Sequence, residues 1–270
     1  AACRPAREPG RVAPEDGAAA GGDADEAWGS EGEDDGDSVS RRVLRANLDA
    51  DSLASPFAAS GDALRALPHA KVEADGSELV YFGMGCMWEA EAVFGAVEGV
   101  VRTQVGFAGG TTPDPTLARP GNHAQVVEVH YDPMVVTFEQ LMIVFWGAHD
   151  ATRRGLVSHW SLVVVVHGGQ RSRAAKFLAM EQAKTRLKVT TTVLPFTTFV
   201  PAELRYQHYF LQQNTALLRQ FAAWPPARFV ASWRTTRINS YLAGHGTAHD
   251  LSRTIGKMGL DDAGVAELSR

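Results

Sequence analysis

Cys86 is the residue whose type and surroundings best suit chemistry in this chain. It lies within the run Gly83-Met84-Gly85-Cys86-Met87-Trp88-Glu89-Ala90-Glu91. The run at residues 79–82 is apolar and aromatic and predicts a buried strand. After the cysteine, apolar side chains recur with the i, i+3, i+4, i+7 spacing of an amphipathic helix, at Ala90, Val93, Phe94 and Val97. This pattern places Cys86 at a strand-to-helix junction. The glycines before it allow the backbone to make the tight turn that such a junction needs.

A helix N-terminus exposes unpaired N–H groups and the positive end of the helix dipole, and both favour an anion. The thiol of Cys86 is therefore expected to ionise readily and to act as a nucleophile. The alternative interpretation is that Cys86 is a small buried hydrophobe without a reactive role. The nucleophile is favoured, because a low-pKa thiol needs the electropositive, partly open position that this junction supplies.

The composition, 45% hydrophobic and 21% charged over 270 residues, is that of a globular protein. A net charge of −5 leaves no basic stripe for phosphates, so no nucleic-acid partner is predicted. No run approaches the roughly 18 consecutive apolar residues of a membrane span, so no membrane partner is predicted either. The two cysteines, Cys3 and Cys86, cannot form a disulfide framework and favour an intracellular reducing compartment, cytoplasmic or organellar. They could still form one transient redox bond.

Residues 1–76 are predicted to be a disordered leader, acidic and rich in glycine. Between Glu15 and Asp37 the chain has ten acidic residues, six glycines and no lysine or arginine, so it cannot bury enough apolar area to offset the entropy of ordering. Leucines within residues 38–76 indicate short helices that could dock on the domain. Residues 1–11 fit the remnant of an organelle transit peptide or, more simply, a solvated tail.

Residues 77–270 alternate strand and helix signals and predict one α/β (α+β) domain, a mixed β-sheet flanked by helices. Further strands are expected at residues 102–107, 127–131, 163–166 and 189–200, the second of them half-buried because apolar and polar residues alternate in it. Capping-box patterns begin helices at Thr137 and Thr247. Another helix should present Phe177, Met180, Ala183 and Leu187 on one side. Pro201 fits the first turn of a helix that runs to about residue 221.

Several motifs together resemble the A-type peptide methionine sulfoxide reductases. Gly85-Cys86-Met87-Trp88-x-x-Glu91 resembles that family's Gly-Cys-Phe-Trp-x-x-Glu signature. Six further pieces resemble the family's motifs in the family's order: Gly106-Phe107-Ala108-Gly109-Gly110, Asp114-Pro115-Thr116, Tyr131-Asp132-Pro133, Phe145-Trp146-x-x-His149-Asp150, Ala202-Glu203-x-x-x-Gln207-x-Tyr209 and Arg237-Ile238-Asn239-x-Tyr241-x-x-Gly244. The resemblance covers roughly residues 77–260 and implies a domain of the ferredoxin-like type.

The resemblance implies that the Cys86 thiolate attacks the sulfur of methionine-S-sulfoxide, in oxidised proteins or in free form. The oxygen leaves as water and Cys86 becomes a sulfenic acid. Trp88 and Met87 are expected to bind the substrate's S-methyl group. An external thiol, thioredoxin or glutathione, is expected to regenerate Cys86, with no bound cofactor and a monomeric enzyme. Cys3 is the only other cysteine that could do so from within the chain.

The chain departs from the family pattern at the positions that handle the sulfoxide oxygen. Gln125 stands where the family has the acid that protonates this oxygen, and an amide can donate a hydrogen bond but supplies no proton at pH 7. Leu117 stands in place of one oxygen-binding tyrosine, and Trp160 aligns with a second. Met87 replaces the aromatic residue of the pocket. Gln125 and Trp160 are therefore substrate-binding candidates, and slow turnover is expected.

Two other functions remain open at this stage. One is a catalytically impaired pseudoenzyme that serves as a methionine-binding or assembly module, and the other is a peroxide-responsive thiol. His245 and His249 have the spacing of helical metal ligands, but neighbouring glycines place them in a loop or cap without a third ligand, so no metal is predicted. Glu91 is interpreted as structural, and Asp150 as a residue that caps or bonds a neighbouring loop.

Overall fold

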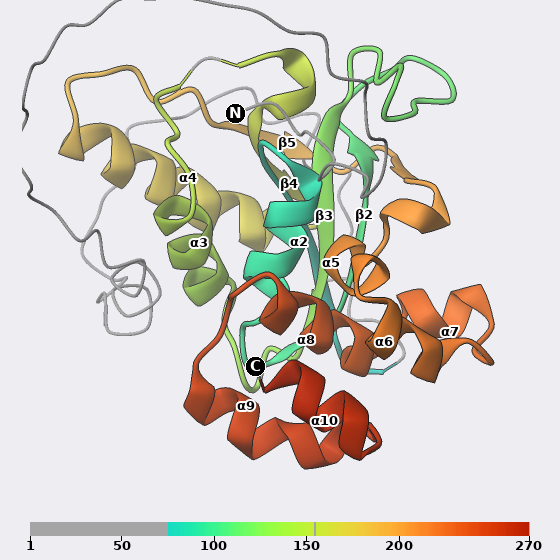
Figure 1. Ribbon diagram of the computed structural model, residues 1–270. Helices are drawn as coiled ribbons and strands as arrows, with labels where there is room; N and C mark the ends of the chain where they lie inside the picture. Colours follow the sequence, from blue (N-terminus) through green and yellow to red (C-terminus); the bar gives the residue numbers. More distant parts are fainter. Residues whose placement is uncertain (1–74, 154, 270) are drawn as a thin grey trace, which may run out of the picture.

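The structure, a computed structural model, describes residues 75–153 and 155–269. The predicted leader up to residue 74, including Cys3, lies outside the described residues. The centre of the fold is a six-stranded sheet in the order β5-β4-β1-β3-β2-β6 (Figure 1). Its strands are β1 (Glu78–Met84), β2 (Val100–Ala108), β3 (Ala124–Tyr131), β4 (Ser161–Val165), β5 (Thr192–Pro195) and β6 (Phe199–Pro201).

The sheet is mixed, as the sequence predicted. Four of its neighbouring pairs are antiparallel, and β4 and β5 are parallel. The central strand β1 pairs with β3 on one side and with β4 on the other. It ends at Met84, so the chain leaves the middle of the sheet just before Cys86.

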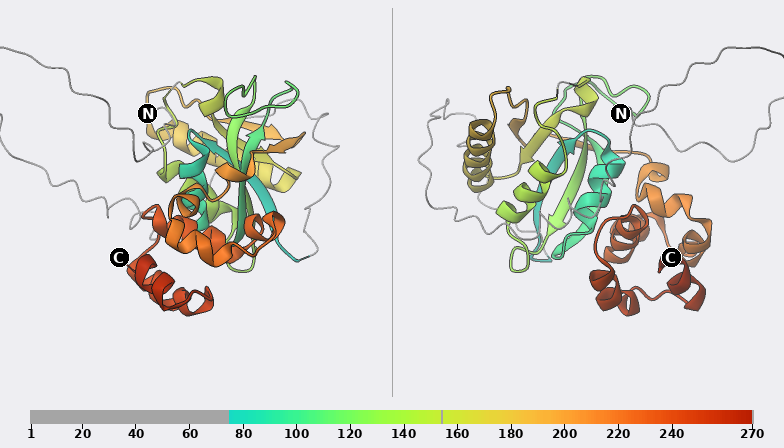
Figure 2. Two further views of the ribbon diagram at one scale, coloured as in Figure 1. Left: turned by 45° about the vertical axis from the view of Figure 1, so that its right-hand side comes forward. Right: turned by 60° about the vertical axis from the view of Figure 1, so that its left-hand side comes forward.

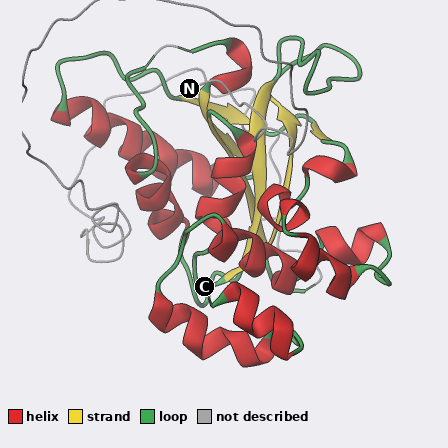
Figure 3. Ribbon diagram, in the orientation of Figure 1, coloured by secondary structure: helices red, strands yellow, loops and turns green. Residues whose placement is uncertain are grey.

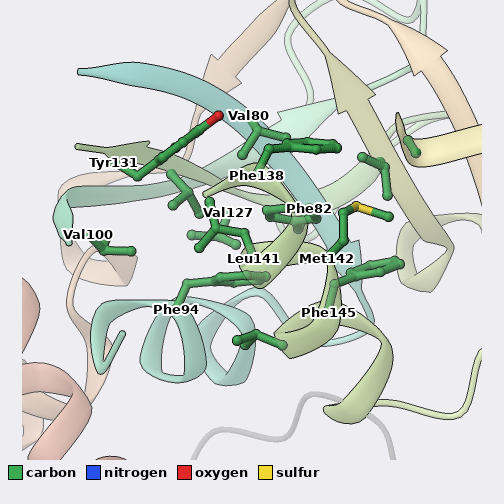
Figure 4. Close-up of a cluster of buried hydrophobic side chains, with 14 of the residues drawn as sticks. Val80, Phe82, Phe94, Val100, Val127, Tyr131, Phe138, Leu141, Met142 and Phe145 are labelled. Carbon is green, nitrogen blue, oxygen red and sulfur yellow. The ribbon is translucent and has the colours of Figure 1, made fainter. Parts of the chain in front are cut away.

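Three helices cover one face of the sheet, namely α2 (Met87–Gly95), α3 (Phe138–Gly147) and α4 (Gly168–Lys184) (Figure 1). The largest core cluster fills the space between them, and Phe82 of β1 stacks on Phe94 of α2 with ring centroids 4.4 Å apart (Figure 4). The opposite face carries a smaller cluster around Tyr81 and Leu162. Among the described residues, every helix is too short or too polar to cross a bilayer.

The chain ends in a layer of short helices beneath the sheet and α2 (Figures 2 and 3). These are α5 (Tyr209–Gln213), α6 (Thr215–Leu218), α7 (Pro226–Val230), α8 (Trp233–Leu242), α9 (Ala248–Thr254) and α10 (Asp262–Leu268), which share a separate apolar cluster. Helix α8 packs on α2, where the buried Arg237 guanidinium donates hydrogen bonds to the carbonyls of Ala96 and Val97. A cation at this end of α2 complements the negative end of the helix dipole.

The predictions from the two capping boxes and the strand predicted at residues 163–166 are confirmed. Both capping boxes form, with Thr137 and Gln140 beginning α3 and with Thr247 and Asp250 beginning α9. Strand β4 lies inside the sheet, and all of its residues are buried.

Three expectations for the chain after β2 are wrong. Strand β3 is buried on both faces rather than one, because helices cover one side of it and the second apolar cluster covers the other. Residues 189–200 form two strands at opposite edges of the sheet, and Pro195, which lacks an N–H, ends the first. Pro201 closes β6 rather than opening a long helix.

The helix face predicted from Phe177 to Leu187 was also too long. Phe177 is buried on α4, but the helix ends at Lys184, and Leu187 lies beyond it with 64% of its surface exposed.

Candidate active site

Cys86 is the N-cap residue of α2, one residue after a glycine that turns the chain out of β1. Gly85 has φ +106°, in the region that side-chain-bearing residues rarely adopt, so the turn requires glycine. Cys86 itself has extended backbone angles, and its side chain makes no capping hydrogen bond. It is half-buried. The predicted strand-to-helix junction is therefore present, with the sulfur at the N-terminus of a nine-residue helix.

Cys86 is disulfide-bonded in this structure. The thiolate chemistry expected of Cys86 therefore belongs to its reduced form.

Gln125 of β3 lies at the start of the same helix. Its side-chain oxygen Oε1 accepts a hydrogen bond from the backbone N–H of Met87 at 3.3 Å. Both residues are buried, at 3% and 0% exposure. This bond satisfies one of the N–H groups that a helix N-terminus leaves unpaired, and it holds the carboxamide beside Cys86.

Trp88 forms the aromatic wall of the site together with two tyrosines from a distant segment. Its ring stacks on that of Tyr209 with centroids 4.0 Å apart and planes 8° apart, and Tyr206 lies 5.9 Å away, tilted by 32°. The indole is buried. We call the surrounding apolar group the Trp88 cluster; it comprises Met87, Trp88, Val105, Phe107 and Ala202, with Cys86, Leu117, Tyr206, Tyr209 and Phe210 packed against them.

The segment that carries both tyrosines is held to the sheet by hydrogen bonds. Strand β6 pairs with β2, and the Gln207 carboxamide continues this pairing. Gln207 Oε1 accepts the Val105 N–H at 2.8 Å, and Gln207 Nε2 donates to the Val105 carbonyl at 2.9 Å. The side chain thus imitates a strand neighbour at the edge of β2, which fixes where Tyr206 and Tyr209 meet Trp88.

Leu117 and Trp160, which stand where the family pattern has tyrosines, differ in their position relative to Trp88. Leu117 packs against the Trp88 cluster. Trp160 directly precedes β4, and its carbonyl is 3.0 Å from the point that a Cβ on Gly83 would occupy. Its side chain is 39% exposed and is not part of the Trp88 cluster. Leu117 is therefore better placed than Trp160 to meet a ligand at Cys86.

No role was predicted for Tyr206, Tyr209 and Phe210, although Tyr209 ends one of the family motifs. The signal was the aromatic content of residues 206–210 at the end of that motif. It could be interpreted only once the fold had brought the segment to Trp88.

The Phe-Trp-x-x-His-Asp motif supports the start of β4. His149 Nδ1 lies 2.8 Å from the Phe145 carbonyl and Nε2 lies 2.7 Å from the Ser161 hydroxyl. The carbonyl can only accept, so Nδ1 donates and the neutral ring accepts from Ser161. Burial lowers the pKa of His149, consistent with this neutral form. Asp150 closes a local turn rather than bonding a neighbouring loop, since it accepts from the Thr152 N–H and hydroxyl at 2.9 and 2.7 Å.

No group of three potential metal ligands occurs within residues 75–153 and 155–269. His245 lies in the loop after α8, and His249 lies in the first turn of α9.

The sequence and the fold were compared with known proteins. The family model described as "Peptide methionine sulfoxide reductase" matches residues 78–230. A protein of that name from Drosophila melanogaster is 34% identical over 182 residues, 66% of this chain and 74% of its own. The MsrA protein of Methanococcus maripaludis strain C7 is 36% identical over 152 residues, 53% of this chain and 97% of its own.

Among solved structures, methionine sulfoxide reductase A of Corynebacterium diphtheriae is similar with a TM-score of 0.48 and 34% identity, over 58% of this chain and 87% of that one. The family model ends at Val230, so helices α8–α10 lie beyond it. Because that model covers more than half of the sequence, the chain belongs to the peptide methionine sulfoxide reductase family.

Proposed function

We propose that this protein is a peptide-methionine (S)-S-oxide reductase, which reduces methionine-S-sulfoxide in proteins or in free form. The observation that carries the proposal is the position of Cys86, at the N-terminus of α2 and two residues before the buried indole of Trp88. A thiolate there gains from the helix dipole, and the indole offers an apolar surface beside it for a small alkyl group.

In the proposed reaction, the Cys86 thiolate donates an electron pair to the sulfoxide sulfur. The S–O bond breaks with the uptake of two protons, and water leaves. A water molecule then hydrolyses the resulting sulfur–sulfur bond, which releases methionine and leaves Cys86 as a sulfenic acid. The sum is thiol plus sulfoxide giving sulfenic acid plus thioether, in which Cys86 is oxidised by two electrons and the substrate sulfur is reduced by two.

Trp88 and Met87 are proposed to bind the S-methyl group, and Gln125 to bind the sulfoxide oxygen. The bond from the Met87 N–H orients the Gln125 carboxamide beside the N-terminus of α2. A carboxamide can polarise the S–O bond by hydrogen bonding, but it cannot protonate the oxygen. Departure of the oxygen is therefore proposed to limit turnover. Trp160 remains a proposed substrate contact, since the residue is 39% exposed.

An external dithiol of the thioredoxin type is proposed to regenerate the enzyme. One of its thiols attacks the sulfenic acid and releases water, and its second thiol then reduces the mixed disulfide. Glutathione would need two molecules for the same result. This need for reductant supports a reducing intracellular compartment, cytoplasmic or organellar.

The test is a reductase assay with separate S and R epimers of a methionine sulfoxide peptide. The expected result is oxidation of dithiothreitol that depends on the S epimer and is lost in Cys86→Ser. Binding of the S epimer without turnover would favour the binding-module alternative instead. Fast oxidation by peroxide without sulfoxide reduction would favour the thiol-sensor alternative. The names of the relatives support catalysis over both.

A further inference from the structure

Glu91 is a fully buried carboxylate on the helix that Cys86 begins. Its exposure is 0%, and no other carboxylate in the described part of the chain is classed as buried. A buried carboxylate is unfavourable unless donors surround it. The donors that surround Glu91 therefore show what it holds in place.

One of these donors is the backbone N–H of the residue before Tyr209. The His208 backbone N–H donates to Glu91 Oε2 at 2.9 Å, and His208 Nδ1 lies 3.1 Å from Oε1, within ion-pair distance but outside hydrogen-bond alignment. On the other side of that ring, Nε2 lies 3.2 Å from the Val230 carbonyl. Thr103 of β2 supplies a further donor through its hydroxyl, 3.3 Å from Oε1.

His208 has a backbone conformation that needs such a partner. Its φ and ψ angles are 49° and 53°, in the left-handed region that is unfavourable for a residue with a side chain. It is the N-cap of α5, and Tyr209 is the first residue of that helix. The bond to Glu91 therefore fixes the direction in which the chain enters Tyr209.

Tyr209 in turn stacks on Trp88, which shares a face of α2 with Glu91 because the two residues are three positions apart. Two neighbouring side chains of α2 thus engage two consecutive residues of the distant segment. One tie is polar, from Glu91 to His208, and the other is aromatic, from Trp88 to Tyr209.

We propose that Glu91 is a positioning residue that holds Tyr209 against Trp88 and thereby shapes the surface that binds the substrate's methyl group. The inference rests on the proposed function for its kinetic part only. Glu91 itself contacts protein groups, so it acts through the aromatic pair and does not touch the substrate.

The kinetic test uses Glu91→Leu, which removes the acceptor, and Tyr209→Leu, which removes the ring. Each is expected to raise KM for the methionine sulfoxide peptide about 2- to 12-fold, the worth of one aromatic pair. The value of kcat per titrated Cys86 thiol should stay within a factor of two. The double variant should show no further rise in KM, because both changes remove the same contact. A fully additive rise, or a fall in kcat alone, would overturn the inference.

Two controls separate positioning from general stability. Glu91→Gln keeps an acceptor for the His208 N–H and should leave KM at the wild-type value. Thr103→Val removes a donor to the same carboxylate without touching His208, and should lower the melting temperature but leave KM unchanged. If Glu91→Leu does not fold, Glu91→Asp serves instead, because the shorter side chain withdraws the carboxylate from His208 while keeping its charge.

A readout without substrate makes the two proposals separable. The indole N–H signal of Trp88, assigned with Trp88→Phe in an NMR spectrum, should be shifted by the ring current of Tyr209. Glu91→Leu and Tyr209→Leu should move this signal in the same direction, and Thr103→Val should not. An unmoved signal in Glu91→Leu would refute the positioning role even if the enzyme is active. If the Trp88 signal moves as expected but the wild-type protein reduces no sulfoxide, the proposed function is refuted and the positioning role of Glu91 stands.

Discussion

Replacement of Gln125 by glutamate tests the chemistry of the site most directly. The substitution changes an amide into an acid at nearly constant shape, at a side chain that is 3% exposed and bonded to the Met87 N–H at 3.3 Å. A well-placed general acid contributes on the order of 10²–10⁴-fold to a rate. Burial favours the protonated acid, whereas the Met87 N–H and the helix dipole favour the carboxylate. Because these effects oppose each other, we expect the lower end of the range, about 10²-fold in kcat/KM near pH 6.

The pH profile carries the diagnostic information. The wild-type profile should have no descending limb set by residue 125, because an amide has no proton to lose. The rate of Gln125→Glu should rise as Cys86 loses its proton and fall at higher pH, because the new carboxyl must keep its proton to deliver it to the sulfoxide oxygen. A bell-shaped profile is therefore expected for the variant alone. The assay is S-epimer reduction from pH 5 to pH 8 with saturating dithiothreitol.

Gln125→Met is the matched control, since it keeps the length of the side chain but removes the acceptor of the Met87 N–H. It should lower the free energy of unfolding by about 1–3 kcal/mol, the usual effect of leaving a buried N–H unpaired. It should also lower kcat/KM. If Gln125→Glu is no faster than the wild type at any pH in the range, residue 125 does not face the sulfoxide oxygen.

Three further outcomes follow from the same structure. Leu117→Tyr should raise kcat/KM by up to about 10²-fold, because residue 117 packs against the Trp88 cluster and a tyrosine there can bring a hydroxyl to the sulfoxide oxygen. Trp160→Tyr should change kcat/KM by less than about threefold, because Trp160 lies outside that cluster. Equal effects of the two substitutions would contradict the placement of these side chains. Arg237→Ala should lower the free energy of unfolding by about 2–4 kcal/mol in urea titration, since two carbonyls at the end of α2 lose a charged donor, and a loss below about 1 kcal/mol would show that this cap is unimportant. Burial lowers the pKa of His149 below its value in the unfolded chain, so the free energy of unfolding should fall as the pH drops below about 6.5. Urea titrations at pH 7.5 and 5.5 should show a smaller loss of this free energy in His149→Gln than in the wild type. An equal loss in both proteins would mean that another group takes up the proton.

Local order along the chain could be predicted where neighbouring residues settle the structure by themselves. The apolar run of β1, the turn at Gly85 and the apolar spacing of α2 placed Cys86 at a helix start without tertiary information. The capping boxes at Thr137 and Thr247 were equally local, because each joins groups three residues apart. The family motifs then supplied the candidate chemistry.

The secondary structure of residues 189–221 could not be predicted from neighbouring residues. A threonine- and valine-rich run suits one long strand as well as two short ones, and only the vacant edges beside β4 and β2 decide between them. Pro201 is compatible with both a strand end and a helix start, and its pairing with Gly106 selects the strand.

Residue type and short spacing were enough to identify the nucleophile candidate, the helix that begins at it and the family to which both point. The groups that surround the sulfur depend instead on the tertiary fold. The bond from Met87 to Gln125 spans 38 positions, and the contacts of Trp88 with Tyr209 and of Glu91 with His208 cross more than a hundred. Such contacts arise from the pairing of whole strands and the packing of whole helices, which leaves no periodic signature in the residues that finally meet.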